Sequence, residues 1–384
     1  MNTFGIDYQP TVTVIALREE DGGGAHIASV GDGVRAVIPN AIARDGAWGS
    51  RADRHAPVFA ASSTGGAWVE EPGARLFWGG LYGRLRSYLG RLEPVRRNGY
   101  RVAIALQGAN YSTDAHAVAA LARAAGFDDI VAIPATHALL CRWLASPVLE
   151  RGKEHVVVMI VVGEVSTLVG GFQLEWDSRG LPSVRAASTP LSLEAGQADW
   201  NRRLLDLVRK RLNEEPPAGF ERSLRDAAIR YAIRLSQSSD NQQVEWREIF
   251  EERLFAPLSL SYAECAAWPE SVSFSHQLPE AVRGALRTVG SESADLLVVG
   301  GLGSVWPFAE KVAQGLGPVW HSGVAGDDVA VGAAWWGELC EHPSGMLLDA
   351  VPAIEAAASP QIIAETTPGQ SVLPPWERGN ADAF

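Results

Sequence analysis

Residues 155–175, HVVVMIVVGEVSTLVGGFQLE, form the stretch that decides the fold. The apolar run 156–162 predicts a buried strand, because short continuous apolar runs are typical of strands covered on both faces. Gly163 predicts a tight turn that leads into a second strand, and Gly170–Gly171 predicts a break in that strand. The sequence therefore predicts a β-hairpin in the middle of the chain.

The composition of the 384 residues is typical of a soluble globular protein, with 47% hydrophobic and 20% charged residues. A net charge of −12 and the lack of a Lys/Arg stripe disfavour a nucleic-acid partner. The run 156–162 is far shorter than the roughly 20 residues that a membrane helix needs. Residues 1–10 lack the basic and apolar regions of a signal peptide. We therefore expect a cytoplasmic protein that binds neither nucleic acid nor membrane.

The cysteine and histidine spacings predict no metal centre. Cys141, Cys265 and Cys340 are odd in number and far apart, and no two cysteines have the C-x-x-C spacing. The eight histidines include no H-x-x-x-H or H-E-x-x-H pair. We expect neither a disulfide framework nor a metal site.

Strand and helix signals alternate along the chain, which predicts an α/β fold with mixed sheets. A second hairpin is predicted at 3–17, around Gln9–Pro10, so that two hairpin starts indicate two similar halves. After the first hairpin we expect strands and helices at 101–107, 112–127, 129–134 and 136–145. After the second we expect helices at 198–215, 221–239, 278–290 and 329–340, with a strand, a glycine turn and a helix over 294–317.

Five segments in this order resemble the nucleotide-binding domain of the Hsp70 chaperones, which belong to the actin/hexokinase superfamily. The resemblance covers about residues 3–340. It implies an α/β, actin-like ATPase fold of two lobes, each built on a duplicated mixed-sheet, ribonuclease-H-like core, around a central cleft. Two segments, FGIDYQPT (4–11) and VVMIVVGEVSTLVGGFQLE (157–175), resemble the phosphate hairpins of that family. Residues 102–144 resemble its strand, helix, strand and crossing helix, and residues 193–212 with 223–239 resemble its helices beside the adenine. Residues 295–337 resemble its adenosine motif and closing helix.

The same resemblance implies a division of the chain. Residues 1–150 together with 328–342 are expected to form lobe I, and residues 151–327 to form lobe II. Residues 343–384, rich in Pro and Ala, are expected to form a flexible tail. Because the sequence stops shortly after the closing helix, we expect no substrate-binding domain.

The residues with which that family holds Mg²⁺ and phosphate are mostly replaced. Asp7 is retained in the first hairpin, but residues 8–10, Tyr-Gln-Pro, stand where the family has a glycine and small hydroxyls. In the second hairpin the family's two aspartates fall on Val161 and Leu168. Burying apolar side chains is favourable by about 25 cal/mol per Å², whereas a buried, unpaired carboxylate is costly. The pattern is what a pseudo-ATPase would show.

The residues that remain at the matching positions are the candidate site residues. Asp7 and Glu164 are the catalytic candidates, as a remnant ligand of Mg²⁺-bound water and a replacement for the lost acids. Their structural interpretations are a hairpin cap or arginine partner for Asp7 and a solvated turn residue for Glu164. For the glycines the structural interpretation is a permissive backbone turn. The resemblance implies nucleotide contacts from Thr11, Gly163, Ser236, Gly300 and Gly301.

We interpret the chain as an Hsp70-like pseudo-ATPase that acts through protein contacts and needs no cofactor. Its expected partner is a protein, for which it serves as an accessory chaperone, adaptor or assembly factor. The alternative is a divergent ATPase that binds ATP or ADP with Mg²⁺ and uses Asp7 and Glu164. A third interpretation is a subunit of an actin-like polymer. A cleft between two lobes is also a concave site that a different ligand could occupy.

Overall fold

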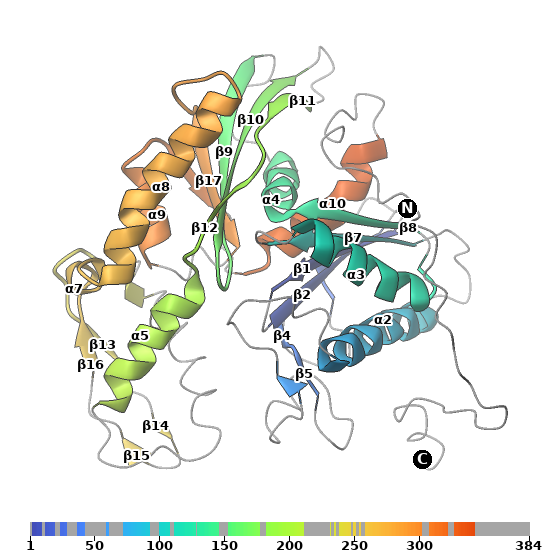
Figure 1. Cartoon of the computed structure of the whole chain (residues 1–384), viewed down its shortest axis with the longest axis horizontal. Helices are drawn as coiled ribbons and strands as arrows, with labels where there is room; N and C mark the ends of the chain where they lie inside the picture. The colour runs from blue at the N-terminus through green and yellow to red at the C-terminus, as the bar shows by residue number, and fades with distance from the viewer. Residues whose placement is uncertain are drawn as a thin grey trace.

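The computed structural model contains two six-stranded mixed β-sheets, with helices between them and on their outer faces (Figure 1). The residues that the structure describes are 2–9, 12–19, 24–28, 37–42, 59–60, 72–92, 100–107, 111–127, 129–145, 153–176, 182–210, 231, 234–235, 238–246, 249–250, 253–254, 258–301, 307–321 and 326–341. The mixed α/β class expected from the sequence is confirmed.

The first sheet is built on the predicted N-terminal hairpin. Its strands are β1 (Asn2–Tyr8), β2 (Val12–Arg18), β3 (His26–Ile27), β4 (Val37–Pro39), β7 (Tyr100–Leu106) and β8 (Asp129–Pro134). They follow the order β3-β2-β1-β7-β8, with β4 also paired to β2. Strand β1 is antiparallel to β2 and parallel to β7, and β7 is parallel to β8. The sheet therefore consists of a hairpin extended on one side by two parallel strands.

The second sheet repeats this arrangement around the predicted central hairpin. Its strands are β9 (Glu154–Val162), β10 (Thr167–Trp176), β11 (Pro182–Ala187), β12 (Leu191–Leu193), β17 (Leu296–Gly301) and β18 (Val319–His321). They follow the order β11-β10-β9-β17-β18, with β12 also paired to β10. Strand β9 is antiparallel to β10 and parallel to β17, and β17 is parallel to β18. The two similar halves that the two hairpin starts predict therefore have one topology.

The helices cover both faces of each sheet. Figure 1 shows α4 (Ala135–Leu144) and α10 (Asp328–Glu341) between the two sheets. The opposite face of the first sheet is covered by α2 (Pro72–Leu92) and α3 (Tyr111–Ala124), and that of the second by α8 (Pro269–Thr288) and α9 (Pro307–Gln314). The remaining elements are α5 (Gln197–Arg209), α7 (Tyr262–Ala266), and the strand pairs β5 (Ala41–Ile42) with β6 (Phe59–Ala60), β13 (Val244–Trp246) with β16 (Leu258–Leu260), and β14 (Ile249–Phe250) with β15 (Arg253–Leu254).

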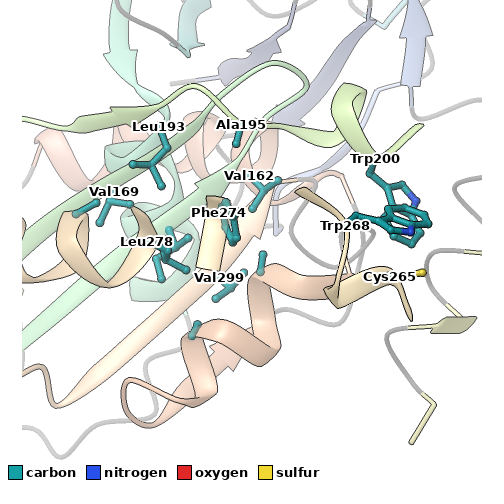
Figure 2. Close-up of a cluster of buried hydrophobic side chains, with 14 of the residues drawn as sticks. Val162, Val169, Leu193, Ala195, Trp200, Cys265, Trp268, Phe274, Leu278 and Val299 are labelled. Atoms are coloured by element: carbon teal, nitrogen blue, oxygen red, sulfur yellow. The ribbon is translucent and has the colours of Figure 1, made fainter. Parts of the chain in front are cut away.

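Alternation along the strands divides the core into layers. Val158, Ile160 and Val162 of β9 face α8, whereas Val157, Met159 and Val161 face α4. Such alternation places successive side chains on opposite faces of a sheet. Figure 2 shows the layer under α8, in which Val162, Val169 and Val299 lie near Phe274 and Leu278, and Trp200 packs on Trp268 with ring centroids 4.6 Å apart.

Glycines and alanines let the inter-sheet helices approach each other and the first sheet closely. A Cβ built on Gly332 of α10 would lie 1.9 Å from the carbonyl oxygen of Ala138 in α4. A Cβ on Gly5 of β1 would lie 2.0 Å from the carbonyl oxygen of Ala330 in α10. The helix axes approach this closely because no side chain intervenes. The α4–α10 contact is therefore a fixed element of the interior.

The break predicted at Gly170–Gly171 is wrong, because β10 runs through both glycines. A Cβ on Gly170 would lie 3.2 Å from the side chain of Thr136 in α4, and one on Gly171 would lie 2.8 Å from the carbonyl oxygen of Ala285 in α8. The two glycines therefore allow a helix to approach the strand on each face. Glycine is used here because it lets another backbone approach closely, and not because the chain turns.

The helix predicted at 278–290 begins earlier than expected, at Pro269. Pro269 stands at the first helical position, where a missing N–H removes no intrahelical bond. The helix continues through Pro279, since Phe274, Leu278 and Val282 share one buried face. Tertiary packing therefore outweighs the local penalty of an internal proline.

Several sequence expectations lie outside the described residues. These are Thr11, Ser236, most of the helix at 221–239 and the tail at 343–384. In the described part of the chain, no helix has both the length and the apolar character needed to cross a bilayer.

Candidate functional site

The candidate site lies where the carboxyl ends of the first sheet's parallel strands meet the hairpin turn of the second sheet. Asp7 is near the end of β1, Gln107 directly follows β7, and Gly163 directly follows β9. Ligands of open α/β sheets bind at the carboxyl ends of the strands. This place in the fold is therefore where a ligand site is expected.

Asp7 is completely buried, and both of its carboxylate oxygens are within reach of amide donors of the chain. Gln9 Nε2 donates to Oδ2 at 2.9 Å, and Gln107 Nε2 lies 3.4 Å from Oδ1. The first contact is within Asp7's own hairpin, whereas the second comes from the neighbouring strand β7. The carboxylate is thus engaged by side chains of the protein itself.

Burial raises the pKa of Asp7 to about 7, and the nearby carboxyl group of Asp328 also raises it. The hydrogen bonds from Gln9 and Gln107 act in the opposite direction. Asp328, at the start of α10, is buried and lies 3.8 Å from the Arg142 guanidinium. Burial also raises the pKa of the neighbouring Asp327, while Arg142 lowers it. Close to neutral pH Asp7 therefore changes between a neutral and a charged group.

Polar side chains also form hydrogen bonds with the described ends of the first hairpin, at Gln9 and Thr13. Thr13 Oγ1 donates to Asn40 Oδ1 at 2.7 Å, and Asn40 Nδ2 donates to the carbonyl oxygen of Gln9 at 2.8 Å. The buried Oε1 atom of Gln9 has no hydrogen-bond partner among the described residues. The side-chain carbonyl oxygen of Gln9, next to Asp7, is therefore an acceptor that no described donor uses.

The turn of the second hairpin is closed by backbone hydrogen bonds. The Gly163 N–H donates to the Ser166 carbonyl at 2.8 Å. The Gly163 and Glu164 carbonyls accept from the N–H groups of Gln197 and Ala198, at 3.0 and 2.8 Å. The first N–H groups of a helix are otherwise the donors that bind anions. At the start of α5, two of these N–H groups donate to the carbonyls of the hairpin turn instead.

Gln107 fills the space beside this turn. A Cβ built on Gly163 would lie 1.5 Å from Gln107 Oε1, so the amide of Gln107 rests directly on the Gly163 backbone. Together with the Ser166 carbonyl oxygen, 2.9 Å from such a Cβ, this contact favours a glycine at 163. Gln107 was missed by the sequence analysis, although a polar residue at the carboxyl end of a buried strand is a usable signal.

Val161 and Leu168, where the resemblance places the family's aspartates, belong to the apolar layer against α4. Val161 is fully buried and Leu168 nearly so, in one cluster with Ala135 and Leu139. The two residues are opposite each other in the β9–β10 pair. A carboxylate at either position would be buried in this layer without a charged partner, at high cost. Packing therefore accounts for the apolar residues at these positions.

The other candidates are dispersed around the turn. Glu164 is partly buried, and its carbonyl is the acceptor for Ala198. Gly300 and Gly301 end β17, paired with Val161 and Val162. A Cβ on Gly300 would lie 2.4 Å from the Leu139 side chain, and Gly301 has φ +69°, a conformation that favours glycine. Both glycines thus have structural reasons to be there.

His137 is a second buried titratable group, in the layer between the two sheets. It lies in α4 with 3% of its surface exposed, and its ring is 5.1 Å from Phe172 and 6.4 Å from Trp336, measured between centroids. Its Nδ1 is 3.4 Å from Thr136 Oγ1, and its Nε2 has no hydrogen bond within the described residues. Burial lowers the pKa of His137 to about 4. The imidazole is therefore neutral at physiological pH.

The variant His137→Phe is expected to remove a loss of stability in acid. Between pH 6.5 and about 4 the imidazole is protonated in the unfolded chain but stays neutral in the folded protein. The free energy of unfolding therefore falls as the pH falls. The loss amounts to about 3 kcal/mol at most. Urea unfolding at pH 4.5 and 7.5 measures it, with the exposed His116→Asn as the control. An unchanged pH dependence in His137→Phe would contradict this assignment.

Within the described ranges, no three His, Cys, Asp or Glu side chains gather into a group that could hold a metal ion. The chemistry at the site is that of one buried carboxyl group, two primary amides and a closed glycine turn.

A scan against models of known protein families and a search of curated proteins both find no match to this sequence.

Proposed function

We propose that the protein is an Hsp70-like pseudo-ATPase with an actin-like fold, which acts through contacts with a protein partner as an accessory chaperone, adaptor or assembly factor. The observation that carries the proposal is the contact of Gln107 with both Asp7 and Gly163. A side chain of the protein fills the place between the two hairpins.

The groups that nucleotide binding requires support this interpretation, because they are already used within the chain. A phosphate cradle needs free backbone N–H groups, and Mg²⁺ needs carboxylates with open oxygens. Here the N–H of Gly163 is bonded within its turn, and the oxygens of Asp7 are engaged by amides. The positions opposite, Val161 and Leu168, are apolar and buried. Among the described residues, the Gly163 N–H and the Asp7 oxygens are therefore already used within the chain and are not open to a Mg-phosphate group.

The repeated sheet topology supports the proposed two-lobed fold. Each sheet has a hairpin followed by two parallel strands, as in a duplicated ribonuclease-H-like core. Helix α10 packs on β1, β2 and β7, which supports the assignment of residues 328–342 to the same lobe as residues 1–150. Residues 151–327 contain all strands of the second sheet. Function is then left to the surfaces of the two lobes.

An ATP hydrolysis assay tests the proposal. We expect phosphate release by the wild type to equal that by Asp7→Ala and by buffer alone, because Asp7 is bound by amides and cannot order a Mg²⁺-bound water. A measurable turnover that Asp7→Ala and Glu164→Ala both abolish would overturn the proposal and establish the divergent ATPase. The exposed variant Glu280→Ala is the matched control for a change of surface charge.

A further inference from the structure

Gln107 belongs to one half of the fold and contacts the other. Its backbone directly follows β7 of the first sheet, and its Nε2 lies 3.4 Å from Asp7 Oδ1 in the same sheet. Its Oε1 and carboxamide carbon lie against Gly163, at the turn of the second sheet. One primary amide therefore spans the boundary between the two sheets.

We propose that Gln107 is a strap, a side chain that joins the Asp7 end of the first sheet to the Gly163 turn of the second and fixes the spacing of the two halves at this edge of their interface. Its length is what fits it for this role, because glutamine reaches the turn while its Nε2 still faces Asp7. Shortening the side chain breaks both contacts at once. The strap goes beyond the pseudo-ATPase proposal, since it holds the halves whether or not a nucleotide binds.

The consequences extend to helix α5. The Gly163 and Glu164 carbonyls, which Gln107 helps to position, accept hydrogen bonds from the Gln197 and Ala198 N–H groups. A Cβ on Gly196 would lie 2.4 Å from the Glu164 carbonyl, so α5 begins directly against the turn. Release of the strap therefore frees the turn and exposes the first amides of α5.

The charged groups around the strap define how it can be switched experimentally. They include Asp7 on β1, Asp327 directly before α10, Asp328 at its start and Arg142 on α4, with Arg142 3.8 Å from Asp328. The variant Gln107→Glu keeps the length but replaces the donor that faces Asp7 with a carboxylate. Two ionised carboxylates repel each other at this distance, whereas a shared proton restores a hydrogen bond. The variant converts a constant strap into one that holds in acid and opens in base.

The test measures the distance between spin labels on the two halves. The labels are attached at the exposed positions Ala120→Cys on α3 and Arg287→Cys on α8, with Cys340→Ser to remove a native thiol; Cys141 and Cys265 are buried. We expect one narrow distance distribution in the background with Gln107 intact and a longer, broader one in Gln107→Ala. Amide exchange of Gln197 and Ala198 in that variant should be about tenfold faster, the loss expected for one hydrogen bond.

Gln107→Glu gives a comparison within a single sample. Its distribution should match that of intact Gln107 at pH 5 and that of Gln107→Ala at pH 8.5. The double variant that combines Asp7→Asn with Gln107→Glu should restore the narrow distribution at pH 8.5, because the amide introduced at position 7 donates to the new carboxylate. Gln173→Ala is the matched control, since Gln173 binds the Glu154 carboxylate within one sheet at 2.5 Å.

Three results would overturn the proposal. One is a distribution in Gln107→Ala that equals that of intact Gln107. Another is a Gln107→Glu distribution that does not change with pH. The third is a change in Gln173→Ala as large as that in Gln107→Ala. If Gln107→Ala fails to fold, the pH series of Gln107→Glu decides alone.

Discussion

Gly332→Ala is expected to destabilise the protein by about 3 kcal/mol or more, although alanine is the better helix former. The new Cβ would lie 1.9 Å from the backbone oxygen of Ala138 and 3.0 Å from the Cβ of Arg142. Backbone atoms cannot rotate aside as a side chain does, so α10 must move away from α4. That movement opens the layer between the two sheets, where apolar packing is dense. The measurement is the free energy of unfolding in urea.

Gly79→Ala is the matched control for this prediction. Gly79 also lies inside a helix, α2, but a Cβ there would meet no atom within 4 Å. The same substitution should therefore stabilise the protein by about 0.5–1 kcal/mol, through helix propensity alone. Opposite signs for Gly332→Ala and Gly79→Ala are the expected result. Equal effects, or a Gly332→Ala variant as stable as the wild type, would contradict the close α4–α10 contact.

Asp7→Asn is expected to stabilise the protein at pH 8 and to leave its stability nearly unchanged at pH 4. The pKa of Asp7 is about 7 in the folded protein and near 3.8 in the unfolded chain. Burial thus favours the protonated form, so Asp7 contributes most stability below pH 3.8 and loses it as the pH rises to about 7. The loss is at most about 4 kcal/mol. Asparagine is neutral throughout and avoids it.

The measurement for Asp7→Asn is the free energy of unfolding at pH 4, 6 and 8. Asp129→Asn is the matched control, because its partly exposed carboxylate pairs with Arg101 at 2.8 Å. We expect that control to change stability by less than about 1 kcal/mol at each pH. A destabilised Asp7→Asn at pH 8 would contradict the raised pKa, and would indicate that the ionised carboxylate is required by the fold.

Asp7 and His137 are expected to have opposing effects on the pH dependence of the wild type. Between about pH 4 and 6.5 the folded protein holds a proton on Asp7 that the unfolded chain has released, and lacks one on His137 that the unfolded chain has bound. These two contributions nearly cancel in that window. Asp7→Asn should therefore show the pH dependence of the free energy of unfolding that His137 causes, and His137→Phe the one that Asp7 causes.

The sequence predicted most of the framework correctly because its signals are local. The apolar run 156–162 became β9, and the run before Gln9–Pro10 became β1, each followed by the expected antiparallel partner. Strand and helix patterns between 101 and 145 became β7, α3, β8 and α4. In these segments, periodicity and turn residues agree with the tertiary packing.

The errors occurred where distant residues decide the local structure. Gly170 and Gly171 predict a break, but Thr136 and Ala285, which pack closely on them, lie on other elements of the chain. The helix was predicted to begin at 278, beside Pro279, but the buried face of Phe274 and Leu278 extends α8 on its N-terminal side. Glycine and proline have several uses, and sequence alone does not distinguish between them.

The candidate site was only partly predictable for the same reason. The sequence analysis named Asp7, Glu164 and Gly163 as candidates, and Val161 and Leu168 as apolar positions beside them. It could not place Gln107, which is 100 residues away from the carboxylate it contacts. Nor could it give the complete burial of Asp7, which depends on α10 packing over β1.

Calorimetric titration of the purified protein with Mg-ATP and Mg-ADP, to millimolar concentration, tests the central proposal most directly. We expect no binding heat with either nucleotide, because Gln107 and the amide-bound Asp7 occupy the place between the hairpins. Micromolar binding, about −8 kcal/mol, would contradict the pseudo-ATPase proposal and show that a nucleotide displaces the chain's own side chains.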